Sequence, residues 1–193
     1  MKISYPPGAT LLDPDEVTSL VPTSISTQGE LDAFEQANIA DTERWAFRRK
    51  QKACLSEGFI RELHRRMLDQ VWRWAGTYRI SDKNIGASWP QIPERILQLC
   101  GDALYWIEHR RYAWDELGAR FHHRLVAIHP FPNGNGRHAR LMADVLLHAH
   151  GEELFSWGRE GLGRPTETRD HYLAALRAAD ERNFAPLIRF VRS

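Results

Sequence analysis

The sequence predicts a single, mainly α-helical domain: a compact helical bundle with a small β-hairpin flap. Apolar residues recur at three- and four-residue spacing through most of the chain, and residues that start or stop helices stand at the ends of these stretches. The length of 193 residues is that of one globular domain. No repeat, low-complexity segment or linker divides the chain. We therefore expect an arm over residues 1–26 and one domain over residues 27–193.

The helical elements are expected in the following order. Residues 1–25 contain four prolines and little periodicity, which predicts an irregular arm. The first helix begins just after Thr27, because Thr27 and Glu30 form a capping box. A second helix starts near Ser56, where apolar residues recur at helical spacing. The later helices are expected from residue 93, from about 115 to 128, from 135 to 151, over 169–180 and over 184–191.

The segment between Trp74 and Pro93 has a different pattern. Glycines and a proline punctuate it, and short extended-type runs lie between them, which predicts a β-hairpin or flap over about residues 77–92. Such a flap can hold a partner segment by adding a strand to an exposed edge. The candidate docking residues are Arg79, Ile85 and Trp89.

Composition and charge exclude several classes of function. Lys and Arg total 26 against 25 Asp and Glu, a net charge of +1, so no global field draws the chain to nucleic acid or to a membrane. Cys54 and Cys100 lie in apolar helical patterns, which favours buried free thiols and a reducing cytoplasm over disulfides or zinc. The first eight residues lack the apolar core of a signal peptide, and no apolar stretch approaches the ~20 residues of a membrane span.

The informative segment is residues 129–140, HPFPNGNGRHAR, at the junction of two expected helices. Gly134 and Gly136 allow close approach of a ligand, and the amides that begin a helix point outward without helical partners. Such a concavity binds anions, especially phosphate. Arg137 and Arg140 share a face of that helix, and two guanidinium groups match a di- or triphosphate better than a single carboxylate.

His129 ends the preceding helix beside this anion site. Its ordinary pKa near ~6.5 lets it accept a proton at cytoplasmic pH, so the segment predicts phosphoryl or nucleotidyl transfer. A Gly-Asn-Gly turn alone is common, and two arginines three apart alone usually form a solvated face. Their conjunction with the histidine within twelve residues favours a functional site.

The segment resembles the Fic (filamentation induced by cAMP) family, whose signature is His-Pro-Phe-x-Asp/Glu-Gly-Asn-Gly-Arg-x-x-Arg. Every specified position matches except Asn133, where most of the family has a carboxylate. Residues 74–93 resemble the flap that precedes the motif, and the resemblance covers about residues 27–190. The opening PGATLLDPDE and the PNGNGRHAR form of the motif are similar to a subgroup called mobile mystery protein B.

The resemblance implies a Fic fold and transfer of AMP from ATP to a Ser, Thr or Tyr hydroxyl of a target protein, with release of pyrophosphate. It implies His129 as the base, Phe131 as the loop anchor within the nucleotide-binding segment, Gly134, Asn135 and Gly136 as the cradle of the α-phosphate, and Arg137 and Arg140 as ligands of the β- and γ-phosphates. A family variant that phosphorylates has lysine at the second glycine, so Gly136 argues against it. An antitoxin or other regulator is a further partner that the toxin-like subgroup implies.

Two positions bear on activity. At position 133 the family uses a carboxylate to bind Mg²⁺, and Asn133 keeps one neutral oxygen, so weaker metal affinity is expected. This leaves an alternative, a catalytically weakened nucleotide-binding regulatory module of the same fold. Many family members also carry an inhibitory glutamate that pairs with the second motif arginine. Glu35, in the first expected helix, matches that motif in part and is the candidate inhibitor of Arg140.

Overall fold

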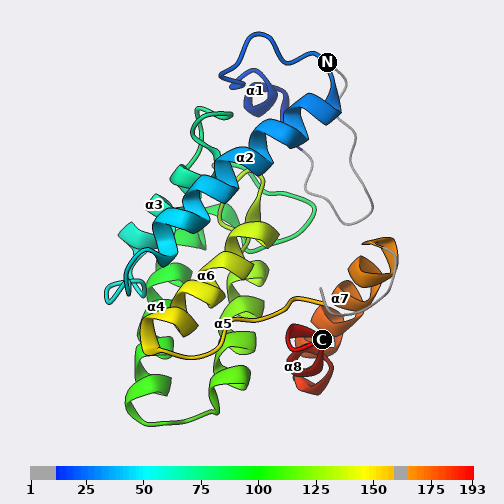
Figure 1. Ribbon diagram of the computed structural model, residues 1–193. Helices are drawn as coiled ribbons and strands as arrows, with labels where there is room; N and C mark the ends of the chain where they lie inside the picture. Colours follow the sequence, from blue (N-terminus) through cyan, green and yellow to red (C-terminus); the bar gives the residue numbers. More distant parts are fainter. Residues whose placement is uncertain (1–11, 159–164) are drawn as a thin grey trace.

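The computed structural model describes residues 12–158 and 165–193, and it consists mainly of helices (Figure 1). The helices are α1 (Pro14–Val17), α2 (Gln28–Phe47), α3 (Glu57–Leu68), α4 (Ile92–Glu108), α5 (Trp114–Ile128), α6 (Asn135–His150), α7 (Pro165–Asp180) and α8 (Ala185–Val191), and a 3-10 turn, η1 (Trp89–Gln91), precedes α4. Among the described residues the β-type pairing is one isolated antiparallel bridge, between Leu20 and Trp72. The mainly helical class is confirmed.

The helix boundaries follow local signals in the sequence. Thr27 Oγ1 accepts a hydrogen bond from the Glu30 amide at 3.2 Å, and the Glu30 carboxylate accepts one from the Thr27 amide at 3.0 Å, so the capping box is confirmed. Ser56 caps α3 by accepting from the Phe59 amide at 3.2 Å. Gly151 ends α6 with a φ of 81°. The seventh helix begins at Pro165, earlier than residue 169.

The arm is more ordered than an irregular segment. It contains α1, which Asp13 and Glu16 close with a capping box. Beyond α1 it pairs with the chain after α3: the Val21 amide donates to the Val71 carbonyl at 2.8 Å. The expectation of an irregular arm is therefore wrong for this part. Residues 7–11, part of the resemblance to mobile mystery protein B, lie outside the described residues.

Two hydrophobic clusters hold the helices together. The larger one joins residues of α2 to α6, and the smaller one joins α5 and α6 to α7, α8 and the segment around Phe155 and Trp157. In Figure 1, α7 and α8 accordingly stand to one side of the larger group. Cys54 and Cys100 are free and buried, as expected, and burial raises the pKa of each thiol to about 11.

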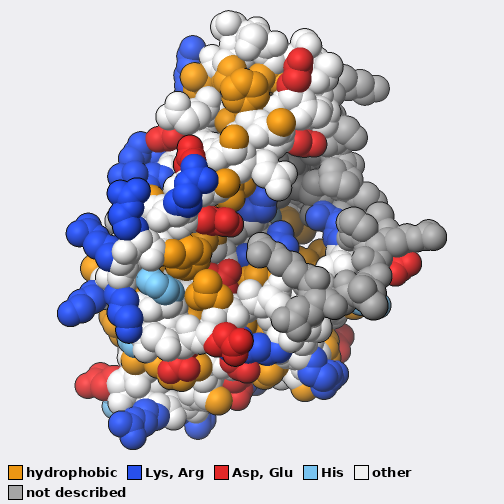
Figure 2. Space-filling model, in the orientation of Figure 1, with side chains coloured by type: hydrophobic (Ala, Val, Ile, Leu, Met, Phe, Trp, Pro, Cys, Tyr) orange, Lys and Arg blue, Asp and Glu red, His pale blue; other side chains and the backbone are white. Residues whose placement is uncertain are grey.

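The face of the molecule drawn in Figure 2 carries charges of both signs. Acidic and basic side chains both occur across the face in Figure 2, in keeping with the net charge of +1. Within the described ranges, none of the helices combines the length and hydropathy needed to cross a bilayer.

The flap is not a β-hairpin. Residues 77–88 form turns and irregular chain, with no strand, and residues 89–91 form η1. The reason is that its amides pair with the chain around His129 instead of with each other: the Arg79 amide donates to the Pro130 carbonyl at 3.0 Å, and the Ala87 amide donates to the Ile128 carbonyl, at the end of α5, at 3.2 Å. The segment, which we continue to call the flap, is thus bound directly to the chain around His129.

Candidate active site

His129 lies where α5 ends. It adopts a left-handed conformation with a φ of 54°, and Pro130 follows, so the helix stops and the chain turns into the motif loop. The side chain is buried, and this burial lowers its pKa to about 4; a hydrogen bond with the Val126 backbone opposes the shift, and the charges of Arg79 and Lys83 add to it. The imidazole is therefore neutral at pH 7 and has a nitrogen that can accept a proton.

Phe131 anchors the motif loop in the core. It is fully buried and stacks on His64 of α3, with ring centroids 3.6 Å apart. His64 in turn holds the loop: its Nδ1 accepts from the Gly76 amide at 3.0 Å, so the proton of the neutral ring is on Nε2, which donates to the Asn133 carbonyl at 3.0 Å. Burial holds the pKa of His64 well below its usual range. Phe131 thus supports the loop from beneath.

Asn135 closes the loop with its side chain. Its Oδ1 accepts from the Phe131 amide at 2.9 Å, and its Nδ2 donates to the Phe131 carbonyl at 2.8 Å. The side chain is buried, so the group of Asn135 that can serve an α-phosphate is its backbone amide, at the first position of α6. Its place in the cradle of the α-phosphate stays a prediction.

The two glycines of the loop differ in what they allow. Gly134 has a φ of +77°, and a Cβ there would lie 2.9 Å from Leu68 Cδ1, so a side chain at this position is strained and crowded. Among the described residues outside its own turn of helix, a Cβ at Gly136 would meet no atom within 4 Å. The first turn of α6 therefore opens onto free space at Gly136, where an anion can approach the helix amides.

The motif arginines face different neighbours. Arg137 forms an ion pair with Glu35 of α2, with Nη1 and Oε2 2.6 Å apart. Arg140 donates from Nε to the Gly136 carbonyl at 3.3 Å, and its guanidinium carbon lies 5.4 Å from the ring centre of Tyr172 on α7. Both arginines remain near the start of α6, one on the side of α2 and the other on the side of α7.

Glu35 is a buried link between helices rather than a surface glutamate. It is 7% exposed, and besides the ion pair its Oε1 accepts from Trp72 Nε1 at 2.7 Å. The expected partner, Arg140, is wrong in this structure: the glutamate pairs with Arg137, the first arginine of the motif. The reason is geometric, because the buried face of α2 that carries Glu35 meets α6 at the turn that carries Arg137.

Of the three flap residues expected to dock a target, one has a different role. Arg79 is 2% exposed, and its guanidinium donates to the carbonyls of His129 at 2.7 Å, of Ser81 at 2.7 Å and of Ala87. It therefore fastens the flap to the motif and cannot contact a target. Ile85 and Trp89 are exposed and remain available.

The flap touches His129 closely at Gly86. Gly86 has a φ of +108°, and a Cβ there would lie 2.7 Å from the Cβ of His129. Only glycine allows the flap backbone to pass this near the histidine. On its other side the flap is fixed to the arm by Lys83, whose Nζ lies 2.8 Å from Asp13 and 2.6 Å from Glu16.

The residues present do not fit a magnesium site built by the protein. Asn133 supplies an amide oxygen in place of a carboxylate, and this oxygen accepts from the Gly134 amide at 2.6 Å. No group of three or more His, Cys, Asp or Glu side chains with metal-binding geometry occurs in the described ranges. Mg²⁺ prefers anionic oxygen, so most of its ligands here would have to come from a bound nucleotide.

The comparisons with known proteins agree with this geometry. Residues 54–147 match the model of the Fic/DOC family. The chain carries a Fic/DOC family domain. The larger family resemblance is thus confirmed, whereas the mobile mystery protein B subgroup stays a prediction.

Curated relatives and solved structures share this Fic domain. Protein adenylyltransferase fic-1 of Caenorhabditis briggsae is 34% identical over 138 residues, 68% of this chain, and protein adenylyltransferase Fic of Drosophila virilis is 32% identical over 145 residues, 73% of this chain. The chain spans 25% and 28% of the length of these two relatives. The structure of BepC of Bartonella tribocorum, solved with bound AMPPNP, matches with a TM-score of 0.70 at 18% sequence identity. The match covers 92% of this chain and 95% of the BepC chain. That likeness establishes the fold.

Sequence reasoning missed two residues that position the Fic motif. His64 stands among the apolar residues of α3, and nothing in the sequence indicates that it supports Asn133. Nothing in the sequence distinguishes Lys83 from an ordinary surface lysine, yet its side chain is 3% exposed. One signal was available: Asp13 and Glu16 form a second capping box, which predicts α1 and places two carboxylates in the arm.

Proposed function

We propose that this protein is an adenylyltransferase that transfers AMP from ATP to a Ser, Thr or Tyr hydroxyl of a target protein and releases pyrophosphate. The observation that carries the proposal is the junction of α5 and α6, where a neutral, buried His129 precedes a glycine-lined helix start with two arginines. The names of the curated relatives, protein adenylyltransferases, support the same reaction.

The proposed chemical step needs one base and one anion site. The imidazole of His129 accepts the proton of the target hydroxyl as the hydroxyl oxygen bonds to the α-phosphorus of ATP. The bond from that phosphorus to the oxygen bridging to the β-phosphate breaks, and pyrophosphate leaves with the electron pair. The amides at the start of α6 stabilise the charge that develops on the α-phosphate oxygens.

The remaining residues bind and orient the substrates. Gly134, Asn135 and Gly136 form the cradle through their backbone, with Phe131 beneath it. Arg137 and Arg140 pair with the β- and γ-phosphates, because guanidinium groups form charge-assisted hydrogen bonds with phosphate oxygens. With ATP bound, Asn133 would offer magnesium its amide oxygen, and the phosphates would have to supply the anionic ligands.

Regulation and docking extend the proposal. Arg137 cannot bind a phosphate with its Nη1 while Glu35 holds that group, so the ion pair supports an inhibitory role for Glu35. The exposed Ile85 and Trp89 support the flap as the surface that meets the target. A cytoplasmic location rests on the two free thiols, and an antitoxin or regulator as a further partner rests on the resemblance alone.

A second candidate function is a nucleotide-binding regulatory module of the same fold. Asn133 favours it, since the loss of a carboxylate weakens the metal site on which transfer depends. In this case ATP binds at the start of α6 and is not consumed.

Incubation with α-labelled ATP and a cell lysate separates the two functions. The adenylyltransferase transfers label to protein, and His129→Ala abolishes labelling while ATP affinity stays nearly unchanged, because the histidine acts in the transition state. His171→Ala, a change of an exposed histidine on α7, is the matched control. Equal labelling by His129→Ala removes the histidine from the mechanism; binding of ATP without labelling, also in Glu35→Gly, favours the regulatory module.

A further inference from the structure

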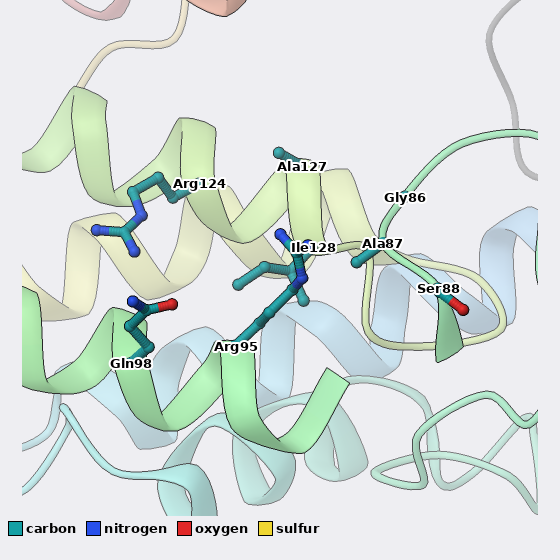
Figure 3. A pocket seen from close by; sticks show the side chains of 8 residues that line it. All are labelled: Gly86, Ala87, Ser88, Arg95, Gln98, Arg124, Ala127 and Ile128. Atoms are coloured by element: carbon teal, nitrogen blue, oxygen red, sulfur yellow. The ribbon is translucent and has the colours of Figure 1, made fainter. Parts of the chain in front are cut away.

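A polar pocket of about 430 Å³ lies between α4, α5 and the flap (Figure 3). Arg95 and Gln98 extend into it from α4, Arg124 borders it from α5, and Ala87 and Ser88 of the flap form its other end. Its remaining lining residues are Gly86, Ala127 and Ile128. The pocket is thus open to solvent, lined by hydrogen-bond donors and separate from the phosphate cradle at the start of α6.

One guanidinium group, that of Arg95, gives the pocket its net positive charge. Arg124 is neutralised by Asp102, with Nη1 and Oδ2 2.6 Å apart. Arg95 donates from Nε and Nη2 to the neutral amide oxygen of Gln91, at 3.1 and 3.0 Å, and forms no ion pair within the part of the chain that the structure describes. The Gln98 amide and the Ser88 hydroxyl add uncharged donors. A single carboxylate matches this set in both charge and hydrogen bonding.

The pocket adjoins the catalytic histidine. Ile128, which lines it, precedes His129 directly, and Gly86, which also lines it, lies so close that its Cβ would be 2.7 Å from the Cβ of His129. An extended chain advances roughly 3.3 Å per residue, so a peptide with its hydroxyl at His129 can place a neighbouring side chain in the pocket. A polyphosphate fits less well, because one uncompensated charge cannot balance several and Asp102 stands nearby.

We propose that this pocket recognises the target by binding an Asp or Glu side chain close in sequence to the modified hydroxyl. The inference rests on the proposed adenylyltransferase function and specifies its targets as acidic segments. Arg95 is the specificity-determining residue, and Gln98 and Ser88 orient the carboxylate. A phosphorylated side chain carries more negative charge than the single free guanidinium of the pocket can balance, and the test also measures whether such a side chain binds.

The test measures binding of fluorescent nine-residue peptides to the full chain by anisotropy, at low salt and without nucleotide. One peptide has a central Thr flanked by Glu on both sides; the others have Gln or phosphoserine in place of Glu. The wild type should bind the Glu peptide about threefold to tenfold more tightly than the Gln peptide, the range expected for a partly exposed ion pair. Arg95→Glu should remove this preference. Arg177→Glu, the same change on the exposed face of α7, should keep it.

Several results would overturn the proposal: equal binding of the Glu and Gln peptides, binding of neither, tighter binding of the phosphoserine peptide, or a preference that survives Arg95→Glu. Thermal melting of Arg95→Glu and Arg95→Gln shows whether the fold is kept. Because no nucleotide is present, the result is separate from transfer. If the wild type prefers the Glu peptide but labels no protein in the lysate, the proposal for the pocket stands and the proposed adenylyltransferase function fails. If it labels protein but shows no preference for the Glu peptide, the proposed function stands and the proposal for the pocket fails.

Discussion

Glu35 of α2 and Arg137 of α6 form an ion pair of 2.6 Å at the mouth of the phosphate cradle, and the same carboxylate accepts from Trp72 at 2.7 Å. The pair occupies the guanidinium that the proposed reaction needs for a phosphate. The tryptophan contact holds the carboxylate in place, since a buried indole N–H left without an acceptor is costly. In this structure the Nη1 group of Arg137 is therefore occupied by a fixed carboxylate.

The first prediction concerns release of this pair. Glu35→Gln removes the charge but keeps an acceptor for Trp72, so it should raise labelling and lower stability less than Glu35→Gly, which also leaves the Trp72 N–H without an acceptor. A charge-assisted hydrogen bond contributes about 1.5–3 kcal/mol, so the gain should be roughly 10- to 100-fold. Labelling with α-labelled ATP and urea unfolding measure the two effects.

Glu43→Gln, the same change on the same helix away from Arg137, is the control and should label as the wild type does. If Glu35→Gln and the wild type label equally at saturating ATP and magnesium, the pair has a structural role alone.

Local signals in the sequence predict much of this fold, and tertiary geometry decides the rest. Thr27 and Gly151 mark helix ends because capping depends on residues within one turn. Glu35 was assigned the wrong arginine because its partner depends on where α2 crosses α6. The spacing of residues 129–140 correctly predicts a short loop followed by the first turns of a helix, because that geometry is local, whereas phosphate binding at this place stays a prediction.

The flap shows where sequence reasoning fails. Its alternation of extended-type runs and glycines predicts strands, but the amides of Arg79 and Ala87 donate to the carbonyls of Pro130 and Ile128, on either side of His129. A charged residue also predicts an exposed side chain, yet the guanidinium of Arg79 is buried and donates to three backbone carbonyls. Neither fact is encoded within a few residues of the position concerned, so both required the three-dimensional structure.

The second prediction is a loss of stability in mild acid. Burial lowers the pKa of His122 and His138 to about 3 and that of His129 to about 4, and it holds the pKa of His64 well below its usual range. Below about pH 6.5 the unfolded chain binds protons that the folded chain does not, so the free energy of unfolding falls as the pH drops from about 6.5 to 4. Each such histidine contributes up to about 1.4 kcal/mol per pH unit.

Urea unfolding at pH 7.5, 6.0 and 5.0 measures this dependence. His138→Gln should be less stable at pH 7.5 but should show a shallower decline with falling pH, because one of the buried groups no longer titrates. His171→Gln, a change of an exposed histidine, should decline as the wild type does. A wild type that is equally stable at all three pH values contradicts the prediction.

The third prediction concerns the contact between the arm and the flap. Lys83 is nearly buried against Asp13 and Glu16, and Ser81 donates to Asp13 at 2.6 Å. Lys83→Met removes the charge and leaves two carboxylates facing each other, so the arm should detach from the flap. Amide hydrogen exchange of residues 79–88 should accelerate about tenfold or more, which corresponds to about 1.4 kcal/mol of local stability.

Lys52→Met, at an exposed position before α3, is the control and should leave exchange in the flap unchanged. Unchanged exchange of residues 79–88 in Lys83→Met would show that Arg79 alone fixes the flap.

The fourth prediction concerns the metal ligand. Asn133→Asp restores the carboxylate that the Fic signature has at this position, and an aspartate oxygen can still accept from the Gly134 amide, so the loop should keep its shape. The magnesium concentration that gives half-maximal labelling should fall about tenfold, and labelling at saturating magnesium should change little.

Asn135→Asp is the contrasting variant, because it replaces the amide donor that holds the Phe131 carbonyl and should unfold the loop without improving metal use. If Asn133→Asp shifts neither the magnesium dependence nor the yield, position 133 does not contact the metal. A gain from Glu35→Gln at saturating magnesium, together with a gain from Asn133→Asp confined to low magnesium, would assign inhibition and metal affinity to separate residues.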